Sequence, residues 1–263
     1  MSRIARTFAN LRSAGRLALI PYFTVGYPDV ATTVELAPAL VAAGADLIEL
    51  GVPFSDPLAD GVTIQRASHA ALEAGVTPRA CLEVARRIRA RVETPLIFMG
   101  YYNPILRYGP DAYCQDTASA GADGLIVPDL PPEEAGELRA AASRAGLDLI
   151  FLLAPTSTDE RIRRVCREAS GFVYCASLAG VTGARQNLAA GLSDFLGRIR
   201  RHTDLPLAVG FGISRPEHVA EVAKVADGAI VGSAVVDRLE SLPAAERVSG
   251  TAAYLATLRA AVP

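Results

Sequence analysis

The sequence predicts an α/β protein that folds as a single (β/α)8 barrel with an extra N-terminal helix, one domain over residues 1–263. Eight short apolar runs typical of buried strands alternate along the chain with stretches of helical periodicity. Three predicted helices end in Ala-Gly-x-Asp, at 43–46, 120–123 and 145–148, where glycine closes the helix and a strand begins. No linker or change in composition interrupts the chain, whose length suits one such barrel.

The elements follow one another in a regular order. Strands are expected at 17–22, 47–50, 95–99, 124–127, 148–153, 172–176, 206–209 and 229–231. Helices are expected after Asp29, over 64–91 with a break near 75–78, and over 132–145, 159–169 and 192–201. Ile4, Phe8 and Leu11 have helical spacing, so the arginine-rich N-terminus is interpreted as a structural helix rather than a targeting peptide.

A doubly wound sheet is the competing architecture. It would place Gly-x-Gly-x-x-Gly after its first strand, and residues 24–28 lack that motif.

Composition excludes several classes of partner and site. A net charge of −2 argues against nucleic acid or an anionic membrane as the main partner. No run approaches the roughly 18 apolar residues of a membrane span, and no secretory segment is visible, so the cytoplasm is the expected compartment. The four cysteines show no Cys-x-x-Cys pattern and are expected to be reduced.

Glu49 is the most unusual residue of the predicted barrel. It lies in the apolar run 47–50, and the two-residue period of a strand directs Leu47 and Glu49 to the same face. Burying a carboxyl group costs free energy unless the group is hydrogen-bonded, neutral or used. Two interpretations follow: a structural acid satisfied by its neighbours, or a catalytic carboxyl at the C-terminal end of a barrel strand.

Glycine turns follow the last two predicted strands. The segment 210–214 (Gly-Phe-Gly-Ile-Ser) can expose backbone N–H groups, and Gly232-Ser233 opens a helix whose N-terminus favours an anion. Phosphate sites of such barrels commonly occupy this place. The sequence therefore predicts a phosphate site here.

The positions of the basic and metal-ligating residues limit the chemistry further. Lys224, the only lysine, lies on a helix, so Schiff-base catalysis is not expected. The three histidines lie in helices or at their ends without metal-ligand spacing, so no metal site is expected. The chemistry that remains is general acid–base catalysis, acting on a phosphorylated substrate that supplies its own electron sink.

Asp60 follows Glu49 across a proline-containing loop. It either folds back over the mouth of the barrel or caps the helix that begins near Ile64. The residues alone favour neither interpretation over the other.

The segment 47–61, Leu-Ile-Glu-Leu-Gly-Val-Pro-Phe-Ser-Asp-Pro-Leu-Ala-Asp-Gly, resembles the signature of the tryptophan synthase alpha chain family. The motifs at 21–22, 99–104, 124–131, 180–185 and 210–214 agree and follow the family's order across essentially the whole chain. Two departures are visible. Val62 stands where the family usually has proline, and Tyr22 stands where phenylalanine is frequent.

This resemblance implies a lyase that cleaves indole-3-glycerol phosphate to indole and glyceraldehyde 3-phosphate in L-tryptophan biosynthesis. Glu49 would then protonate the indole at C3, and Asp60 would accept a hydrogen bond from the indole N–H. Tyr174 would border the glycerol moiety, and Thr182 would meet Asp60 when the loops close. The other implied contacts are Gly183, Gly212, Gly232 and Ser233 to the phosphate and Tyr22, Met99 and Ile126 to the ring.

The resemblance also implies a partner. The alpha chain would carry no cofactor itself and would join a pyridoxal-phosphate beta chain in a heterotetramer of two alpha and two beta chains. The loop 53–60 would serve as catalytic lid and interface. A stand-alone lyase and a mainly regulatory binding subunit remain alternatives, although the intact Glu49 and Asp60 pair counts against the second.

Overall fold

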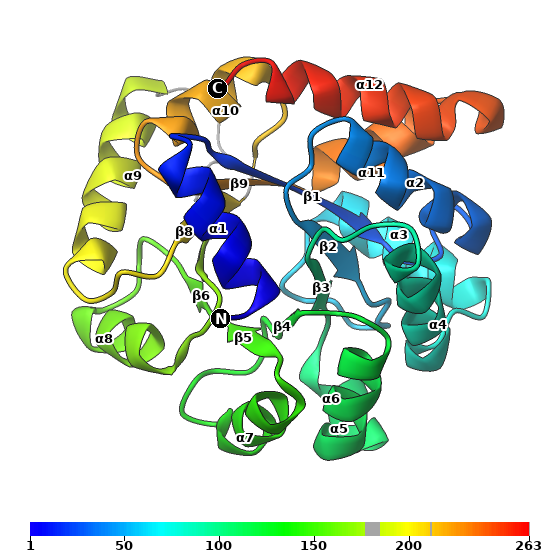
Figure 1. Cartoon of the computed structure of the whole chain (residues 1–263), viewed down its shortest axis with the longest axis horizontal. Coiled ribbons are helices and arrows are strands. Elements are labelled where there is room, and N and C mark those ends of the chain that lie inside the picture. The colour runs from blue at the N-terminus through cyan, green and yellow to red at the C-terminus, as the bar shows by residue number, and fades with distance from the viewer. Residues whose placement is uncertain (177–184, 211, 263) are drawn as a thin grey trace.

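A computed structural model describes residues 1–176, 185–210 and 212–262 and confirms the predicted barrel. All described strand pairs are parallel, in the order β5-β4-β3-β2-β1-β9-β8-β7-β6, and helices surround the strands (Figure 1). The strands are β1 (Ala18–Thr24), β2 (Ile48–Gly51), β3 (Leu96–Met99), β4 (Gly124–Ile126), β5 (Asp148–Ile150), β6 (Leu152–Leu153), β7 (Val173–Ala176), β8 (Leu207–Gly210) and β9 (Gly228–Val231).

The predicted strand over 148–153 is divided at Phe151. Its first part, β5, pairs with β4, and its second part, β6, pairs with β7. The carbonyl of Phe151 accepts the backbone N–H of Tyr174 at 3.0 Å, so the hydrogen-bonded wall continues across the division. A strand that closes a tilted barrel must turn between its two neighbours, which explains the division. β5 and β6 together therefore act as one barrel strand.

The helices are α1 (Arg3–Ser13), α2 (Val30–Ala42), α3 (Val62–Glu73), α4 (Pro78–Arg89), α5 (Tyr102–Tyr108), α6 (Pro110–Ser119), α7 (Gly136–Ala145), α8 (Asp159–Glu168), α9 (Arg185–Arg200), α10 (Pro216–Ala223), α11 (Ser233–Ser241) and α12 (Arg247–Arg259). The expected break between α3 and α4 is confirmed: Gly75 has φ +82°, Thr77 caps α4 and Pro78 begins it. α7 begins later than expected, because residues after Pro131 and Pro132 form turns. No helix in the described part of the chain combines the length and apolar composition needed to cross a membrane.

The strands separate two apolar cores, as the two-residue period requires. Leu47 packs inside the barrel with residues such as Ile97, whereas Ile48 and Leu50 pack outside against the helices. Glu49 shares the inward face with Leu47, and its side chain is buried among these elements.

Helix α1 covers the N-terminal end of the barrel (Figure 1). Ile4, Phe8 and Leu11 are buried against the interior residues, and the rings of Phe8 and Phe172 lie 5.6 Å apart. The prediction of a structural N-terminal helix is confirmed.

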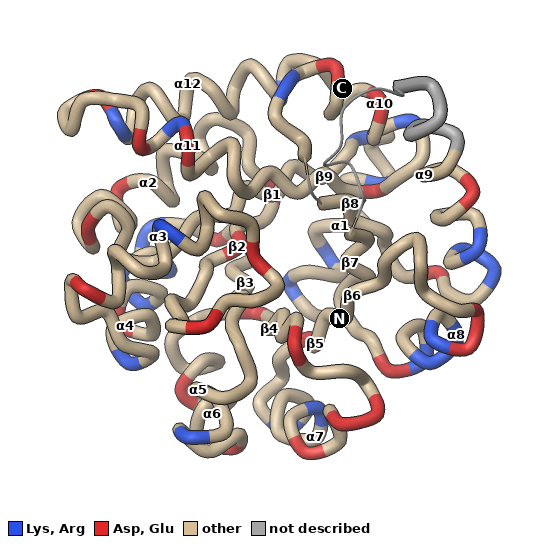
Figure 2. Tube along the Cα trace, turned by 180° about the vertical axis from the view of Figure 1, so that it is seen from behind, with Lys and Arg blue, Asp and Glu red and all other residues tan. Residues whose placement is uncertain are grey.

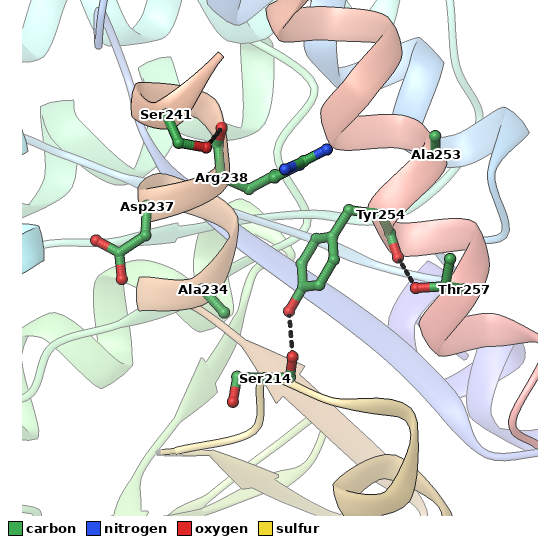
Figure 3. Close-up of a pocket in the computed structure, with 8 residues that line it drawn as sticks. All are labelled: Ser214, Ala234, Asp237, Arg238, Ser241, Ala253, Tyr254 and Thr257. Atoms are coloured by element: carbon green, nitrogen blue, oxygen red, sulfur yellow. Dashed lines mark hydrogen bonds between the residues drawn. The ribbon is translucent and has the colours of Figure 1, made fainter.

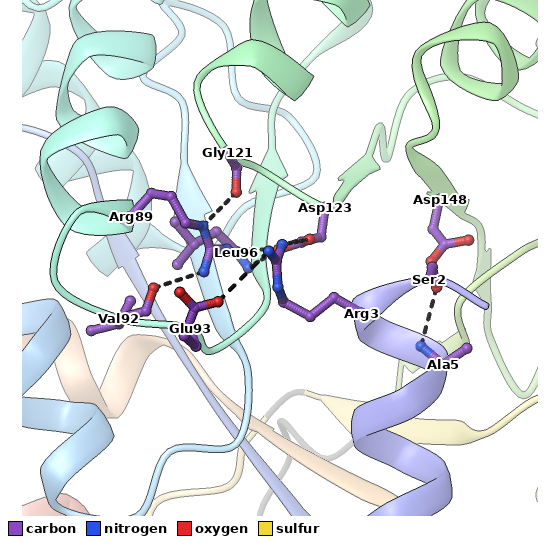
Figure 4. Close-up of polar contacts among 10 residues, drawn as sticks. All are labelled: Ser2, Arg3, Ala5, Arg89, Val92, Glu93, Leu96, Gly121, Asp123 and Asp148. Carbon is purple, nitrogen blue, oxygen red and sulfur yellow. Dashed lines mark hydrogen bonds and ion pairs between the residues drawn. The ribbon is translucent and has the colours of Figure 1, made fainter.

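The aspartates that begin four of the strands bind this helix or the arginines around it. Asp123 accepts hydrogen bonds from Arg3, from Arg89 Nη2 at 2.8 Å and from the backbone N–H of Leu96 at 2.9 Å (Figure 4). The corresponding contacts are Arg16 and Arg259 with Asp46, Arg12 and Arg200 with Asp227, and Ser2 with Asp148. The arginines of the N-terminus therefore have a structural role at the end of the barrel opposite the strand tips.

Replacing Asp123 by alanine is expected to lower the free energy of unfolding by about 3–5 kcal/mol, because it leaves half-buried arginines without their acceptor. Asp111→Ala is the matched control: Asp111 pairs with Arg144 at the surface, both side chains are more than half exposed, and its loss should cost about 1 kcal/mol or less. Denaturant unfolding of the two variants measures the difference. Equal losses would show that the buried aspartate adds nothing specific.

Candidate active site

A cavity of about 230 Å³ opens at the C-terminal ends of the strands. Figure 2 views the barrel from the side opposite to α1, with acidic positions beside β2. The cavity is lined by Tyr22, Glu49, Asp60, Gly61, Ile64, Met99, Tyr174, Gly212, Ile213, Ser214, Ile230, Gly232, Ser233, Ala234 and Asp237. A larger, open depression of about 620 Å³ lies beside it between α11 and α12 (Figure 3), but its lining residues include neither Glu49 nor Asp60. The smaller cavity is therefore the candidate site.

Glu49 is held at the inner wall of this cavity by the strand register. Its Cα pairs with those of Tyr22 in β1 and Ile97 in β3, and the side chain is 1% exposed. Neither carboxyl oxygen has a hydrogen-bond partner among the described residues. Burial, and next the charge of Asp60, raise the pKa of Glu49 to about 8. The carboxyl group is therefore protonated at neutral pH and can give a proton.

Asp60 does not cap the helix that follows it. Gly61 is the N-cap of α3 and no side chain completes the cap, so the capping interpretation is wrong. Asp60 instead lines the cavity, where burial raises its pKa to about 6 while a hydrogen bond with Tyr101 opposes the shift. At neutral pH Asp60 is therefore ionised while Glu49 is protonated. One cavity thus contains an acid and an anion.

The loop between β2 and α3 is folded over the mouth by three sets of contacts. The Ser68 hydroxyl accepts the Phe54 N–H at 2.8 Å and donates to the Phe54 carbonyl at 3.0 Å. The Tyr101 hydroxyl accepts the Ala59 N–H at 3.0 Å, and its ring stacks on Phe54 with centroids 5.0 Å apart. Sequence reasoning included Tyr101 only within the 99–104 motif and did not assign it to the site, although it holds the segment next to Asp60.

Two tyrosines form the inner wall beside Glu49, and each occupies space that a glycine leaves open. A Cβ atom on Gly51 would lie 2.1 Å from the Tyr22 hydroxyl, and one on Gly210 would lie 2.3 Å from the Tyr174 hydroxyl. Burial raises the pKa of both phenols well above the usual range, with further contributions from the acids of the cavity. Both tyrosines therefore stay neutral and can act as hydrogen-bond donors.

One end of the cavity is lined by residues of the turns that follow β8 and β9. Gly212 has φ +76°, a conformation that favours glycine, and Gly232 and Ser233 begin helix α11. The first N–H groups of a helix lack partners within it, and the helix dipole favours an anion there. This end can bind the phosphate of a substrate whose reacting carbon lies near Glu49.

The structure places most of the predicted site residues around this one cavity. Those that line it are Tyr22, Glu49, Asp60, Met99, Tyr174, Gly212, Gly232 and Ser233. Ile126 is fully buried beside Met99 in the β3–β4 register and is not among the lining residues. Thr182 and Gly183 lie outside the described residues. Ile64, Ile230 and Asp237 were not predicted, because helix α3, an inward position of β9 and the second turn of α11 contribute them only in the folded chain.

Side chains capable of other chemistry lie elsewhere. Within residues 1–176, 185–210 and 212–262, no three histidine, cysteine, aspartate or glutamate side chains gather as metal ligands. Lys224, the C-cap residue of α10, is at the surface, where it binds Glu221 at 2.6 Å.

Comparison with known proteins agrees with this geometry. The sequence model of the family described as tryptophan synthase alpha chain matches residues 8–261. The chain belongs to the tryptophan synthase alpha chain family. It is 60% identical to the tryptophan synthase alpha chain of Chloroflexus aurantiacus over 263 residues, covering 100% of this chain and 99% of that one. It is 61% identical to the one from Chloroflexus aggregans over 259 residues, covering 98% and 97%.

Solved structures of the tryptophan synthase alpha chain family have the same fold. Tryptophan synthase from Mycobacterium tuberculosis superimposes with a TM-score of 0.90 at 43% identity, over 99% of this chain and 98% of that one. Tryptophan synthase subunit alpha from Legionella pneumophila gives a TM-score of 0.92 at 40% identity, over 99% and 98%. The resemblance of the 47–61 segment is thus confirmed over the whole chain, and with it a lyase that cleaves indole-3-glycerol phosphate in tryptophan biosynthesis.

Proposed function

We propose that Glu49 and Asp60 divide the acid–base work of this cleavage. The observation that carries the proposal is a fully buried, protonated carboxyl at the wall of a cavity that also contains an ionised carboxylate. A pair of titratable groups with separated pKa values is the usual arrangement for distinct acid and base roles. The substrate would lie with its indole ring between these acids and its phosphate at Gly212, Gly232 and Ser233.

In this reaction the substrate gains one proton on its indole ring and loses one proton from its side-chain hydroxyl. Glu49 gives its proton to C3 of the indole, which makes the ring a cation and an electron sink. The carboxylate formed on Glu49 then takes the proton of the side-chain hydroxyl, the carbon–carbon bond breaks, and its electrons return to the ring. Indole and glyceraldehyde 3-phosphate result, and Glu49 is protonated again. Asp60 accepts the ring N–H and stabilises the positive charge, as a preorganised group does in a water-poor site.

The side chains of Tyr22, Tyr174 and Met99 support the proposed position of the substrate. Tyr22 in β1 and Met99 in β3 line the cavity with Glu49 and belong to one apolar cluster, where they can pack against a flat aromatic ring. Tyr174 borders the same wall and can donate a hydrogen bond toward the glycerol moiety. For Ile126, Thr182 and Gly183, the proposed contacts rest on the family resemblance alone.

The pH dependence of kcat/KM tests the division of roles. We expect a bell-shaped profile with limbs near pH 6 and pH 8. Below the first limb Asp60 gains a proton and loses its charge, and above the second Glu49 loses the proton that it must give. Because the substrate phosphate also titrates near pH 6, Asp60→Asn serves as the control and should remove the acid limb of the enzyme. Activity that stays flat from pH 7 to pH 10 would contradict the role of Glu49.

We further propose that the loop at the cavity mouth binds a tryptophan synthase beta chain, in a complex of two alpha and two beta chains in the cytoplasm. Leu58 is 91% exposed and Val62 is 79% exposed, and both lie on the segment next to Asp60. Two of the four exposed large apolar side chains in the described part of the chain thus lie within five residues of each other. Apolar side chains that gather in this way, unlike scattered ones, are typical of an interaction surface. Pyridoxal phosphate would be the cofactor of the partner and not of this chain.

Leu58→Glu is expected to weaken binding of the beta chain at least about tenfold, because a charge would be buried in an apolar contact. Ala14→Glu, an exposed change at the opposite end of the barrel, should have no effect. Size-exclusion chromatography and calorimetry with the purified beta chain measure the binding. A monomer whose lyase rate is indifferent to beta chain would instead support a stand-alone lyase.

A further inference from the structure

One peptide unit at the phosphate end of the cavity is held by side chains from two helices. The Tyr254 hydroxyl, on α12, donates to the carbonyl of Ser214 at 2.9 Å (Figure 3). The backbone N–H of Ser214 donates to Nδ1 of His218, on α10, at 3.3 Å. Both backbone groups of Ser214 are therefore satisfied by side chains rather than by secondary structure.

This residue belongs to the turn that faces the predicted phosphate. Gly212, Ile213 and Ser214 all line the candidate cavity, and Ser214 also lines the depression between α11 and α12. Ile213 is buried, whereas Gly212 is exposed and has φ +76°. A backbone without a strand or helix partner keeps one orientation only if other contacts hold it.

The chemistry of the two side chains suits this task. A backbone N–H can only donate, so Nδ1 of His218 is the acceptor in this contact. Burial raises the pKa of Tyr254 to about 12, so its hydroxyl keeps the proton that it donates. Each side chain thus supplies the one group that the peptide needs.

We propose that Tyr254 and His218 are positioning residues, which orient the turn 212–214 so that its backbone can receive the substrate phosphate. Neither residue lines the cavity beside the acids, so they act on binding through the turn and not on the proton transfers. The proposal rests on the proposed function insofar as this end of the cavity is the phosphate end.

Binding of inorganic phosphate, measured by calorimetry, tests this role directly. Tyr254→Phe removes one hydroxyl and is expected to raise the Kd of phosphate about three- to tenfold, the effect typical of one hydrogen bond. In the lyase assay KM should rise by a similar factor while kcat stays within about twofold of the wild type, because the lost interaction does not change in the transition state. Tyr108→Phe is the matched control, since Tyr108 is also half-buried and its hydroxyl donates to Asp116 far from the cavity.

A second pair of variants keeps the test valid if Tyr254→Phe is unstable. Asparagine at position 218 can place an amide oxygen near the position of Nδ1, so His218→Asn should keep phosphate binding within about twofold. His218→Leu should weaken it about three- to tenfold at an unchanged melting temperature.

Phosphate affinities of Tyr254→Phe and His218→Leu equal to those of their controls would overturn the inference and leave the lyase assignment intact. Unchanged turnover in Glu49→Gln, with phosphate binding and its dependence on Tyr254 retained, would instead overturn the proposed function.

Discussion

Replacing Glu49 by glutamine is expected to lower kcat about 10³-fold or more while the Kd of inorganic phosphate stays within about twofold of the wild type. General acid–base help typically contributes 10²–10⁴-fold, and glutamine has nearly the same shape but no proton to give. Because Glu49 is neutral at pH 7 in the resting protein, the substitution leaves the charge of the cavity unchanged. Single-turnover release of indole from indole-3-glycerol phosphate is the measurement. Equal losses of binding and turnover would indicate a structural role.

Stability supplies an independent control on Glu49. The pKa of this group is about 8 in the folded protein and near the ordinary 4.5 in the unfolded chain. The folded state therefore holds the proton longer, and the free energy of unfolding should fall as pH rises from about 4.5 to about 8. The slope is at most about 1.4 kcal/mol per pH unit. Glu49→Gln should lack this contribution and unfold at higher denaturant than the wild type at pH 8.

Replacing Asp60 by asparagine is expected to lower kcat about 10²–10³-fold with little change in stability. The amide can still accept a hydrogen bond, but it cannot balance the charge that develops on the ring, and such electrostatic contributions are among the largest in catalysis. No stability loss is expected, because Gly61 and not Asp60 occupies the cap position of α3.

Asp56→Asn is the matched control for this variant, since Asp56 is an exposed acid of the same loop. Steady-state kinetics and thermal unfolding are measured on both. If the two substitutions lowered kcat equally, the effect would belong to the loop as a whole rather than to the carboxylate of Asp60.

The periodicity of the chain predicted the barrel and the direction of Glu49 correctly. Alternation along 47–50 is a local property, because successive side chains of any strand point to opposite faces. Leu47 and Glu49 indeed face the interior, and Ile48 and Leu50 face the helices. The arginine-rich N-terminus was also interpreted correctly as a helix, although its aspartate partners at the strand starts could not be paired from sequence.

The contacts of the loops were beyond such reasoning. Tyr101 meets Ala59 across 42 residues, and Tyr254 meets Ser214 across 40. No local period encodes these pairs, since they form only when α5, α10, α11 and α12 take their places around the barrel. From the sequence alone, Asp60 could be either the cap of the following helix or an acid of the cavity. Only the path of the folded loop distinguished these two interpretations.

The sequence by itself therefore determined the fold class, the family and the inward direction of Glu49, because strand alternation, helix ends and the 47–61 segment are properties of neighbouring residues. Only the tertiary structure decided that Glu49 and Asp60 share one cavity and have separated pKa values. Desolvation depends on what the whole barrel packs around a carboxyl group, and that packing brings together residues far apart in the chain.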